Sequence, residues 1–135
     1  MKQYKVQVYL PPEALYDIRA AVVKAGGGVI GNYSGCMSWW EVQSCWRSEE
    51  GAVPYNGEVG ELTEGTEFLL EFRCDEAHIR AAVNRIKEVH PYERPVINVF
   101  LLFDKEKIQG GRNYGEHKST ASTWRNMETF QRQSL

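Results

Sequence analysis

The chain has 135 residues, of which 42% are hydrophobic and 25% charged, and its formal net charge is −2. This length predicts one main domain, and the small net charge argues against a general affinity for nucleic acid or an anionic membrane. No apolar run approaches the roughly 20 residues that cross a bilayer, and the N-terminus MKQYKVQVYL lacks the apolar block of a signal peptide. Three cysteines without a CxxC spacing argue against a disulfide framework or a structural zinc site. We therefore expect a cytoplasmic protein with no membrane or nucleic-acid partner.

The first part of the chain predicts a strand followed by a helix. Residues 4–10, YKVQVYL, alternate apolar and polar side chains, as in a half-buried strand. Pro11 and Pro12 end this strand, and Pro12 suits the first turn of a helix. The helix carries one apolar stripe, formed by Leu15, Ile18, Val22 and Ala25. The three glycines 26–28 then terminate it.

The middle of the chain predicts two strands separated by a long loop. Residues 36–46, CMSWWEVQSCW, are rich in aromatics and predict a strand or hairpin arm. Residues 48–65 are rich in Gly, Pro and Asn, which predicts a long excursion with a short strand at Val59. Residues 66–74, TEFLLEFRC, alternate again and predict the next strand.

A second helix and a last strand follow. Asp75 is the predicted N-cap of this helix, whose apolar stripe is formed by Ile79, Val83, Ile86 and His90. Residues 96–103, VINVFLLF, are apolar on both faces, which predicts a central or doubly covered strand.

The order of elements predicts an α+β domain of the ferredoxin-like type, βαββαβ. The pentapeptide IRAAV occurs at residues 18–22 and again at 79–83, each time on a helix after an alternating strand. This repeat favours a four-stranded antiparallel sheet with two helices on one face. The other face, with Tyr9, Leu69 and a tryptophan, needs a cover, and a second subunit is the expected one.

The composition changes at Asp104, so we expect a domain over residues 1–104 and a polar tail over residues 105–135. The tail contains Trp124, Met127 and Phe130 at three-residue spacing, compatible with a short amphipathic helix. It is interpreted as mobile, or as an arm that packs on a neighbouring subunit.

Several residue types in this sequence can carry chemistry, but none lies in a specific motif. The glycines before Asn32 and Tyr33 follow a helix rather than a strand, so they predict turns and not a phosphate loop. The cysteines and His78, His90 and His117 show no spacing of a local ligand pair, which leaves a copper or zinc site, or a nucleophilic Cys–His pair, dependent on the fold. The adjacent tryptophans 39 and 40 face opposite sides of a strand and suit a subunit interface or a stacking site.

The segment HPYERP, residues 90–95, has two interpretations. Pro91 and Pro95 force the preceding residues out of helical geometry, so the segment predicts a stiff corner between helix and strand. The alternative is a site that combines His90, Tyr92 and Glu93.

This segment and two others resemble a known family. HPYERPVI resembles the HPYE-x-P signature of CutA, a trimeric ferredoxin-like protein of divalent-cation tolerance that is related in architecture to the PII signalling proteins. The runs AGGGVIGNYSGCMSW, GAVPYNGEVGELTE and HIRAAVNRIKEVHPYERP resemble, in the same order, the CutA-like domain inserted into bacterial Nif-three-like (YqfO) proteins. The resemblance covers nearly all of residues 4–103.

The resemblance implies a CutA/PII-like fold, a homotrimer, and GNY and HPYE positions that cluster near one end of the sheet. The two-metal centre of the full-length Nif-three-like proteins belongs to a flanking domain without a counterpart here, so their cyclohydrolase-type activity is not expected. Some CutA relatives bind copper, which favours a divalent metal ion at His90, Glu93 and Cys36.

We therefore expect a non-enzymatic, oligomeric binding or regulatory module. Its ligand, a small molecule or a metal ion, would occupy a cleft between subunits lined by Asn32, Tyr33, Glu58, His90, Tyr92 and Glu93. The alternatives are a small enzyme that uses Cys36 or His90 with Glu93, and an interaction protein that acts through the tail.

Overall fold

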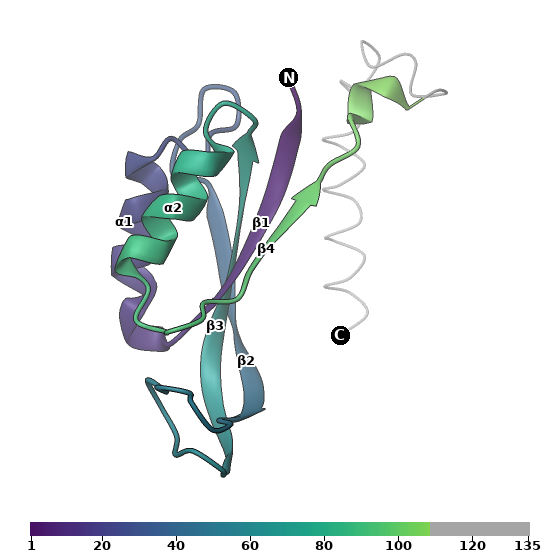
Figure 1. Ribbon diagram of the computed structural model, residues 1–135. Helices are drawn as coiled ribbons and strands as arrows, with labels where there is room; N and C mark the ends of the chain where they lie inside the picture. The colour runs from purple at the N-terminus through teal and green to yellow at the C-terminus, as the bar shows by residue number, and fades with distance from the viewer. Residues whose placement is uncertain (109–135) are drawn as a thin grey trace, which may run out of the picture. The chain divides into compact units, whose positions relative to one another are not determined.

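Two helices cover one face of a four-stranded sheet in the computed structural model, which describes residues 1–108 (Figure 1). The elements in chain order are β1 (Gln3–Leu10), the 3-10 turn η1 (Pro12–Ala14), α1 (Leu15–Lys24), β2 (Met37–Arg47), β3 (Leu62–Asp75), α2 (Ile79–Val89) and β4 (Ile97–Leu101). All neighbouring strands are antiparallel, in the order β2-β3-β1-β4. The predicted βαββαβ ferredoxin-like fold is confirmed.

The core lies between the sheet and the two helices. Alternation along β1 and β3 directs every second side chain towards the helices, and these side chains meet the apolar stripes of α1 and α2. The largest fully buried members are Val6, Val8, Leu10, Ile18, Val22, Leu70 and Ile86. The predicted stripe of α1 contributes to the core, but on α2 Ala82 is fully buried beside Ile86, while the predicted Val83 is only half-buried.

The start of α2 differs from the prediction. Asp75 is the last residue of β3, and α2 begins only at Ile79. One oxygen of Asp75, Oδ1, accepts the backbone N–H of His78 at 3.0 Å and lies 2.7 Å from its ring Nδ1. The hydrogen bond from His78 holds the pKa of Asp75 below its usual value. Asp75 thus stabilises the turn before the helix rather than acting as its N-cap.

The prediction of a central position for the last strand is wrong. β4 lies at the edge of the sheet and pairs only with β1 among the described strands. Its side chains Val99, Phe100 and Leu101 are exposed. An apolar edge strand is an expected site of contact with another chain.

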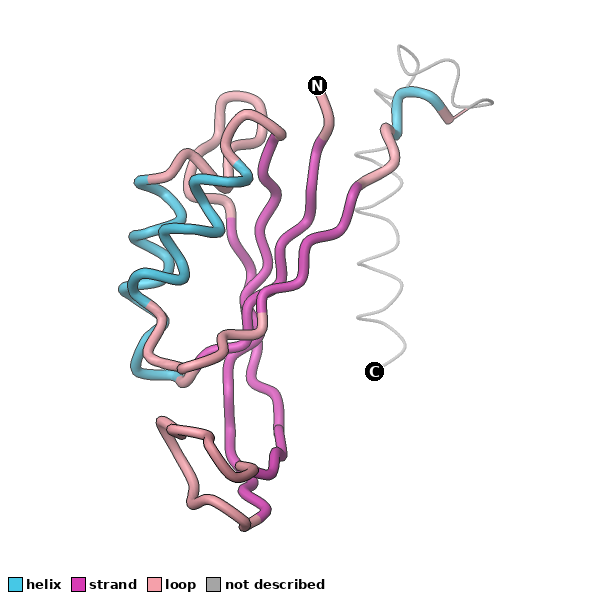
Figure 2. The backbone as a smooth tube through the Cα atoms, viewed as in Figure 1, coloured by secondary structure: helices cyan, strands magenta, loops and turns pink. Residues whose placement is uncertain are grey.

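The face of the sheet opposite the helices is called here the open face, because no helix of residues 1–103 covers it (Figure 2). Trp40, Leu69 and Tyr9 form one row across it, on β2, β3 and β1. Trp40 on β2 and Phe100 on β4 are exposed. The predicted opposite orientation of the two tryptophans is confirmed, since Trp39 lies on the helix side with the Arg19 guanidinium 4.4 Å from its ring centroid.

The two helix–strand connections lie at opposite ends of the sheet (Figure 1). Loop 25–36 lies beside the start of β1, where the Gly28 N–H donates to the Arg73 carbonyl at 2.8 Å. Residues 90–95 lie beside the end of β1, where His90 contacts Tyr9. The expected clustering of the GNY and HPYE positions is therefore wrong. Because β1 and β3 are antiparallel, the helices that follow them begin at opposite ends of the sheet and also end at opposite ends.

The chain divides after Phe103 into two units. In the second unit, the 3-10 turn η2 (Lys105–Lys107) begins with the Asp104 side chain accepting the Glu106 N–H at 2.9 Å. The predicted amphipathic segment at residues 124–130, and His117, lie outside the described residues. Within the described part of the chain, each helix is too short or too polar to traverse a bilayer.

Candidate functional site

Residues 90–95, the HPYERP corner, join α2 to β4. Pro91 cannot continue the helix, and His90 has the extended backbone angles φ −70° and ψ 130°. The Tyr92 N–H donates to His90 Nδ1 at 3.1 Å, so the other ring nitrogen, Nε2, donates to the Tyr9 carbonyl at 2.8 Å. His90 therefore joins the corner to β1 with both of its nitrogens.

The surroundings of His90 keep its ring neutral. Burial lowers its pKa, and this outweighs the Tyr9 carbonyl and the negative charge of Glu67, which both act in the opposite direction. Protonation would place a hydrogen on Nδ1, against the N–H of Tyr92. A metal ion would need the same lone pair. The geometry thus favours the stiff-corner interpretation for His90.

Tyr92 links the corner to β3. Its hydroxyl donates to Glu67 Oε2 at 2.8 Å, and its ring lies 4.8 Å from the His90 ring and 5.6 Å from the Tyr55 ring, between centroids. Burial, followed by the hydrogen bond to Glu67, raises the pKa of Tyr92. The hydroxyl therefore stays protonated and continues to donate at neutral pH.

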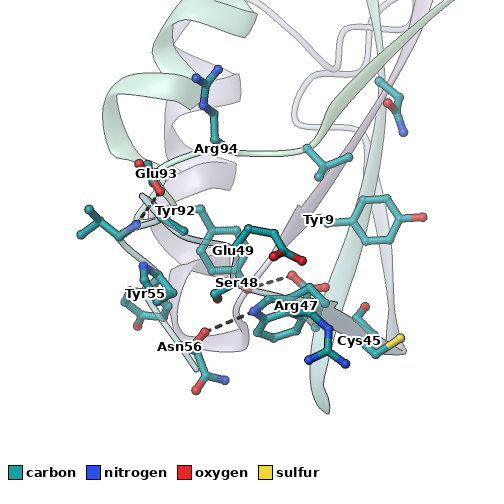
Figure 3. A pocket seen from close by; sticks show the side chains of 18 residues that line it. Tyr9, Cys45, Arg47, Ser48, Glu49, Tyr55, Asn56, Tyr92, Glu93 and Arg94 are labelled. Carbon is teal, nitrogen blue, oxygen red and sulfur yellow. Dashed lines mark hydrogen bonds between the residues drawn. The ribbon is translucent and has the colours of Figure 1, made fainter. Parts of the chain in front are cut away.

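Loop 48–61, between β2 and β3, folds back onto the corner through side-chain to backbone bonds (Figure 3). Glu93 Oε2 accepts the Val53 N–H at 2.9 Å, and the Trp46 indole N–H donates to the Asn56 carbonyl at 3.2 Å. The Tyr55 hydroxyl donates to Glu13 of η1. These bonds hold the loop beside the ends of the strands. The predicted excursion is confirmed, although β3 already begins at Leu62, and Val59 forms only an isolated bridge with Ser48.

Between the loop, the corner and the sheet lies a cavity of about 740 Å³, called here the corner pocket. Figure 3 shows side chains from the sheet, the loop and the corner around it. Four aromatic side chains line it, namely Tyr9, Trp46, Tyr55 and Tyr92. Five charged side chains also line it, namely Arg47, Glu49, Glu67, Glu93 and Arg94. Such a cavity, with aromatic side chains for an apolar ligand surface and polar groups that can orient a ligand, is typical of a small-molecule site.

The predicted site residues separate into two groups. Tyr92 and Glu93 line the corner pocket, and His90 lies directly behind Tyr92. Glu58 is on the same loop but exposed and outside the pocket lining. Asn32 and Tyr33 are exposed at the opposite end of the sheet, where the backbones of Tyr33 and Ile30 form an isolated antiparallel β-bridge. The structure therefore does not bring the six residues into one cleft within a chain.

The metal set Cys36, His90 and Glu93 does not assemble within a chain either. Cys36 lies beside Gly28, at the end of the sheet away from His90, and its N–H donates to the Gly28 carbonyl at 2.8 Å. Within residues 1–108, no three His, Cys, Asp or Glu side chains converge in a group that could hold a metal ion. The metal-ion prediction thus gains no support from these residues.

Sequence reasoning missed Glu67 as a site residue. In the alternating segment TEFLLEF it occupies a position that reads as solvent-facing, yet it is only 7% exposed. The alternation itself places Glu67 on the same face as Leu69, which the sequence predicted to need a cover. In the structure Glu67 lies one residue beyond the end of the β1 pairing. Trp46 was noted in the aromatic segment 36–46, whereas Tyr55 was not singled out, and only the folded loop brings both to the pocket.

Comparison with known proteins now extends the resemblance. No family model matches the chain. A GTP cyclohydrolase 1 type 2 homolog of Bacillus subtilis is 36% identical over 96 residues, which cover 71% of this chain and 26% of that protein. The solved Bacillus cereus protein related to NIF3 superposes with a TM-score of 0.67 at 28% identity, over 76% of this chain and 26% of that one.

The chain is homologous to one region of these NIF3-related proteins. It spans about a quarter of the length of the B. subtilis relative, 26%. The PII-like protein CutA from Nostoc shares the fold, with a TM-score of 0.57 and 24% identity over 80% of this chain and 86% of that one. The predicted resemblance to the NIF3-related and CutA/PII-like proteins is thereby confirmed.

Proposed function

We propose that residues 1–103 of this NIF3-related chain form a non-enzymatic module that binds a small molecule in the corner pocket. The observation that carries the proposal is the pocket itself, with its volume of about 740 Å³ and its four aromatic lining residues. Three separate segments build it. Glu93 accepts the Val53 N–H and Trp46 donates to the Asn56 carbonyl, and these two hydrogen bonds fix the loop at the edge of the pocket. A cavity held open in this way is suited to selective binding.

The positions of the nucleophilic and basic side chains support a binding role over a catalytic one. Cys36 lies at the opposite end of the sheet from His90 and Glu93, so within one chain it cannot form a nucleophile–base pair with either. Burial raises the pKa of the Cys74 thiol to about 11, which keeps it protonated. His90 uses both nitrogens in structural hydrogen bonds.

The B. subtilis relative is a GTP cyclohydrolase 1 type 2 homolog by name. This chain covers 26% of that protein, so the activity does not form part of the proposal.

The module is proposed to act as a homotrimer. The exposed Trp40 and Phe100 on the open face, and the apolar edge of β4, provide surfaces for neighbouring subunits. Tyr9 and Asn98 belong to both the open face and the corner pocket, so a subunit on that face would lie close to the ligand. Light scattering is expected to give three times the mass of one chain, and a monomer at all concentrations would contradict this part.

A ligand screen tests the binding role. Thermal shift measurements with small aromatic and aliphatic compounds should give stabilising hits, and Trp46→Ala should abolish them. Tyr33→Ala, an aromatic deletion at the other end of the sheet, is the matched control and should retain every hit. Hits lost with Tyr33→Ala but kept with Trp46→Ala would place the site elsewhere and refute the proposal.

A further inference from the structure

Glu67 is a buried acid in the corner pocket without a cation beside it. Its side chain is 7% exposed, and none of the ion pairs of residues 1–108 includes it. The nearby His90 accepts the Tyr92 N–H at Nδ1, which occupies the position that a second proton would need. A buried carboxylate without a countercharge is costly, so proteins normally supply a positive partner.

One oxygen of Glu67 remains free to accept a ligand hydrogen. Oε2 accepts the Tyr92 hydroxyl at 2.8 Å, whereas Oε1 accepts no hydrogen bond from the described residues. Glu67 also lines the pocket, so this acceptor is available to a molecule bound there. The Tyr92 hydrogen bond fixes the carboxylate in place before a ligand arrives, which lowers the entropic cost of binding.

The other residues that line the pocket also favour a positively charged ligand. Three carboxylates stand against two guanidinium groups in the pocket lining, which makes it acidic by one charge. The Arg47 guanidinium is already engaged, since its Nη1 donates to the Gly60 carbonyl at 2.9 Å. Aromatic rings attract cations through their negative faces, and the lining contains four aromatic side chains.

We propose that the corner pocket binds a small organic cation with an N–H donor, such as a primary amine joined to an apolar or aromatic group. The ammonium group donates to Glu67 Oε1, and the apolar part lies among Tyr9, Trp46 and Tyr92. A bare metal ion fits less well, because it needs several ligands and no group of three converges in residues 1–108. This inference rests on the proposed binding function and specifies its ligand class.

Calorimetry with three matched probes tests the inference on the full chain. Tyramine carries an aromatic ring and a primary ammonium, 4-ethylphenol lacks the charge, and N,N,N-trimethyltyramine keeps the charge but has no N–H. Because charge-assisted hydrogen bonds contribute about 1.5–3 kcal/mol, tyramine should bind at least about tenfold tighter than either analogue. This comparison uses the unaltered protein, so it does not depend on the folding of a variant.

A substitution then assigns the effect to Glu67. Glu67→Gln keeps the shape of the side chain and an acceptor for the Tyr92 hydroxyl. It should weaken the binding of tyramine by at least about tenfold and leave the affinity for 4-ethylphenol unchanged. Glu64→Gln is the matched control, since Glu64 is an exposed acid on the same strand outside the pocket lining, and it should change neither affinity.

The outcomes separate the inference from the proposed function. Equal affinity for tyramine and 4-ethylphenol, both lost in Trp46→Ala, would overturn the cation inference and leave the binding function standing. A failure of every probe and every screening compound to bind would overturn both. If Glu67→Gln instead reduces the mass of the assembly and leaves tyramine affinity unchanged, Glu67 pairs with a neighbouring subunit, which would also overturn the inference.

Discussion

The two ends of the sheet both looked functional in the sequence, and the corner pocket lies at one of them. At one end, loop 25–36 is a series of turns in which Gly28 has φ +73° and packs its backbone against that of Cys36. Asn32 and Tyr33 project from this loop, and Tyr33 is 74% exposed. At the other end, the HPYERP corner, loop 48–61 and the strand ends converge. The corner pocket therefore forms where a sequence motif meets two segments that are distant in the sequence.

The two ends of the sheet should differ most in how much stability is lost when the histidine on either side of α2 is replaced. His90→Ala removes a buried ring and two hydrogen bonds, so it should lower the free energy of unfolding by about 2–4 kcal/mol. His78→Ala, at the opposite end of the helix, removes an exposed side chain paired with Asp75 and should cost about 1 kcal/mol or less. Urea denaturation measures both, and equal losses would contradict the role given to the corner.

The pH dependence of stability should distinguish the ends as well. Because burial lowers the pKa of His90, the unfolded chain takes up a proton near its ordinary value of 6.5 before the folded chain does. The neutral His90 therefore makes its full contribution to the free energy of unfolding above pH 6.5, and this contribution decreases as the pH falls below 6.5. At the other end, the lowered pKa of Asp75 makes its contribution complete above its ordinary value of 3.8, and that contribution is lost as the pH falls below it.

Denaturation at a series of pH values checks this separation. His90→Gln should flatten the dependence immediately below pH 6.5, and Asp75→Asn should flatten it only in the more acidic range. A His90→Gln profile with the same slope as the unaltered protein would show that His90 is not held neutral.

A smaller effect is expected from removing single hydroxyl groups. Tyr92→Phe deletes the hydrogen bond to the buried Glu67 and should cost about 1–2 kcal/mol in denaturation. Tyr33→Phe makes the same chemical change on an exposed ring, and its effect should lie within about 0.5 kcal/mol. If both variants unfold alike, the Tyr92–Glu67 bond is not a structural link.

The smallest effect concerns the loop rather than overall stability. Glu93→Gln replaces the charged acceptor of the Val53 N–H with a neutral amide oxygen, which accepts a weaker hydrogen bond. Hydrogen exchange at Val53 should therefore become faster, with little change in the melting temperature. Glu58→Gln alters an exposed acid on the same loop and should leave that exchange rate unchanged. Unchanged exchange in Glu93→Gln would show that the loop is held by its other contacts.

Most of the fold could be predicted because it depends on local patterns. Alternation located β1 and the second half of β3, and helical stripes located α1 and α2. The edge position of β4 could not be read in this way, because a strand that is apolar on both faces can be covered by its own chain or by another. Only the pairing of the strands in the folded sheet shows that β4 lies at the edge.

The site was less predictable than the fold. Tyr92 and Glu93 were identified from the corner motif, and both line the pocket. Glu67 was missed because its burial, just beyond the end of the pairing with β1, depends on a corner that is distant in the sequence. Asn32 and Tyr33 were included by resemblance, but they follow α1, which ends at the opposite end of the sheet from α2 because β1 and β3 are antiparallel.

The central claim, that the corner pocket is the ligand site, is tested most directly by mapping tyramine binding with amide and indole NMR shifts. The account predicts saturable shifts at Tyr9, the Trp46 indole and Tyr92, with no change at Asn32 and Tyr33. Shifts centred on Asn32 and Tyr33, with the Trp46 indole unmoved at saturation, would contradict it.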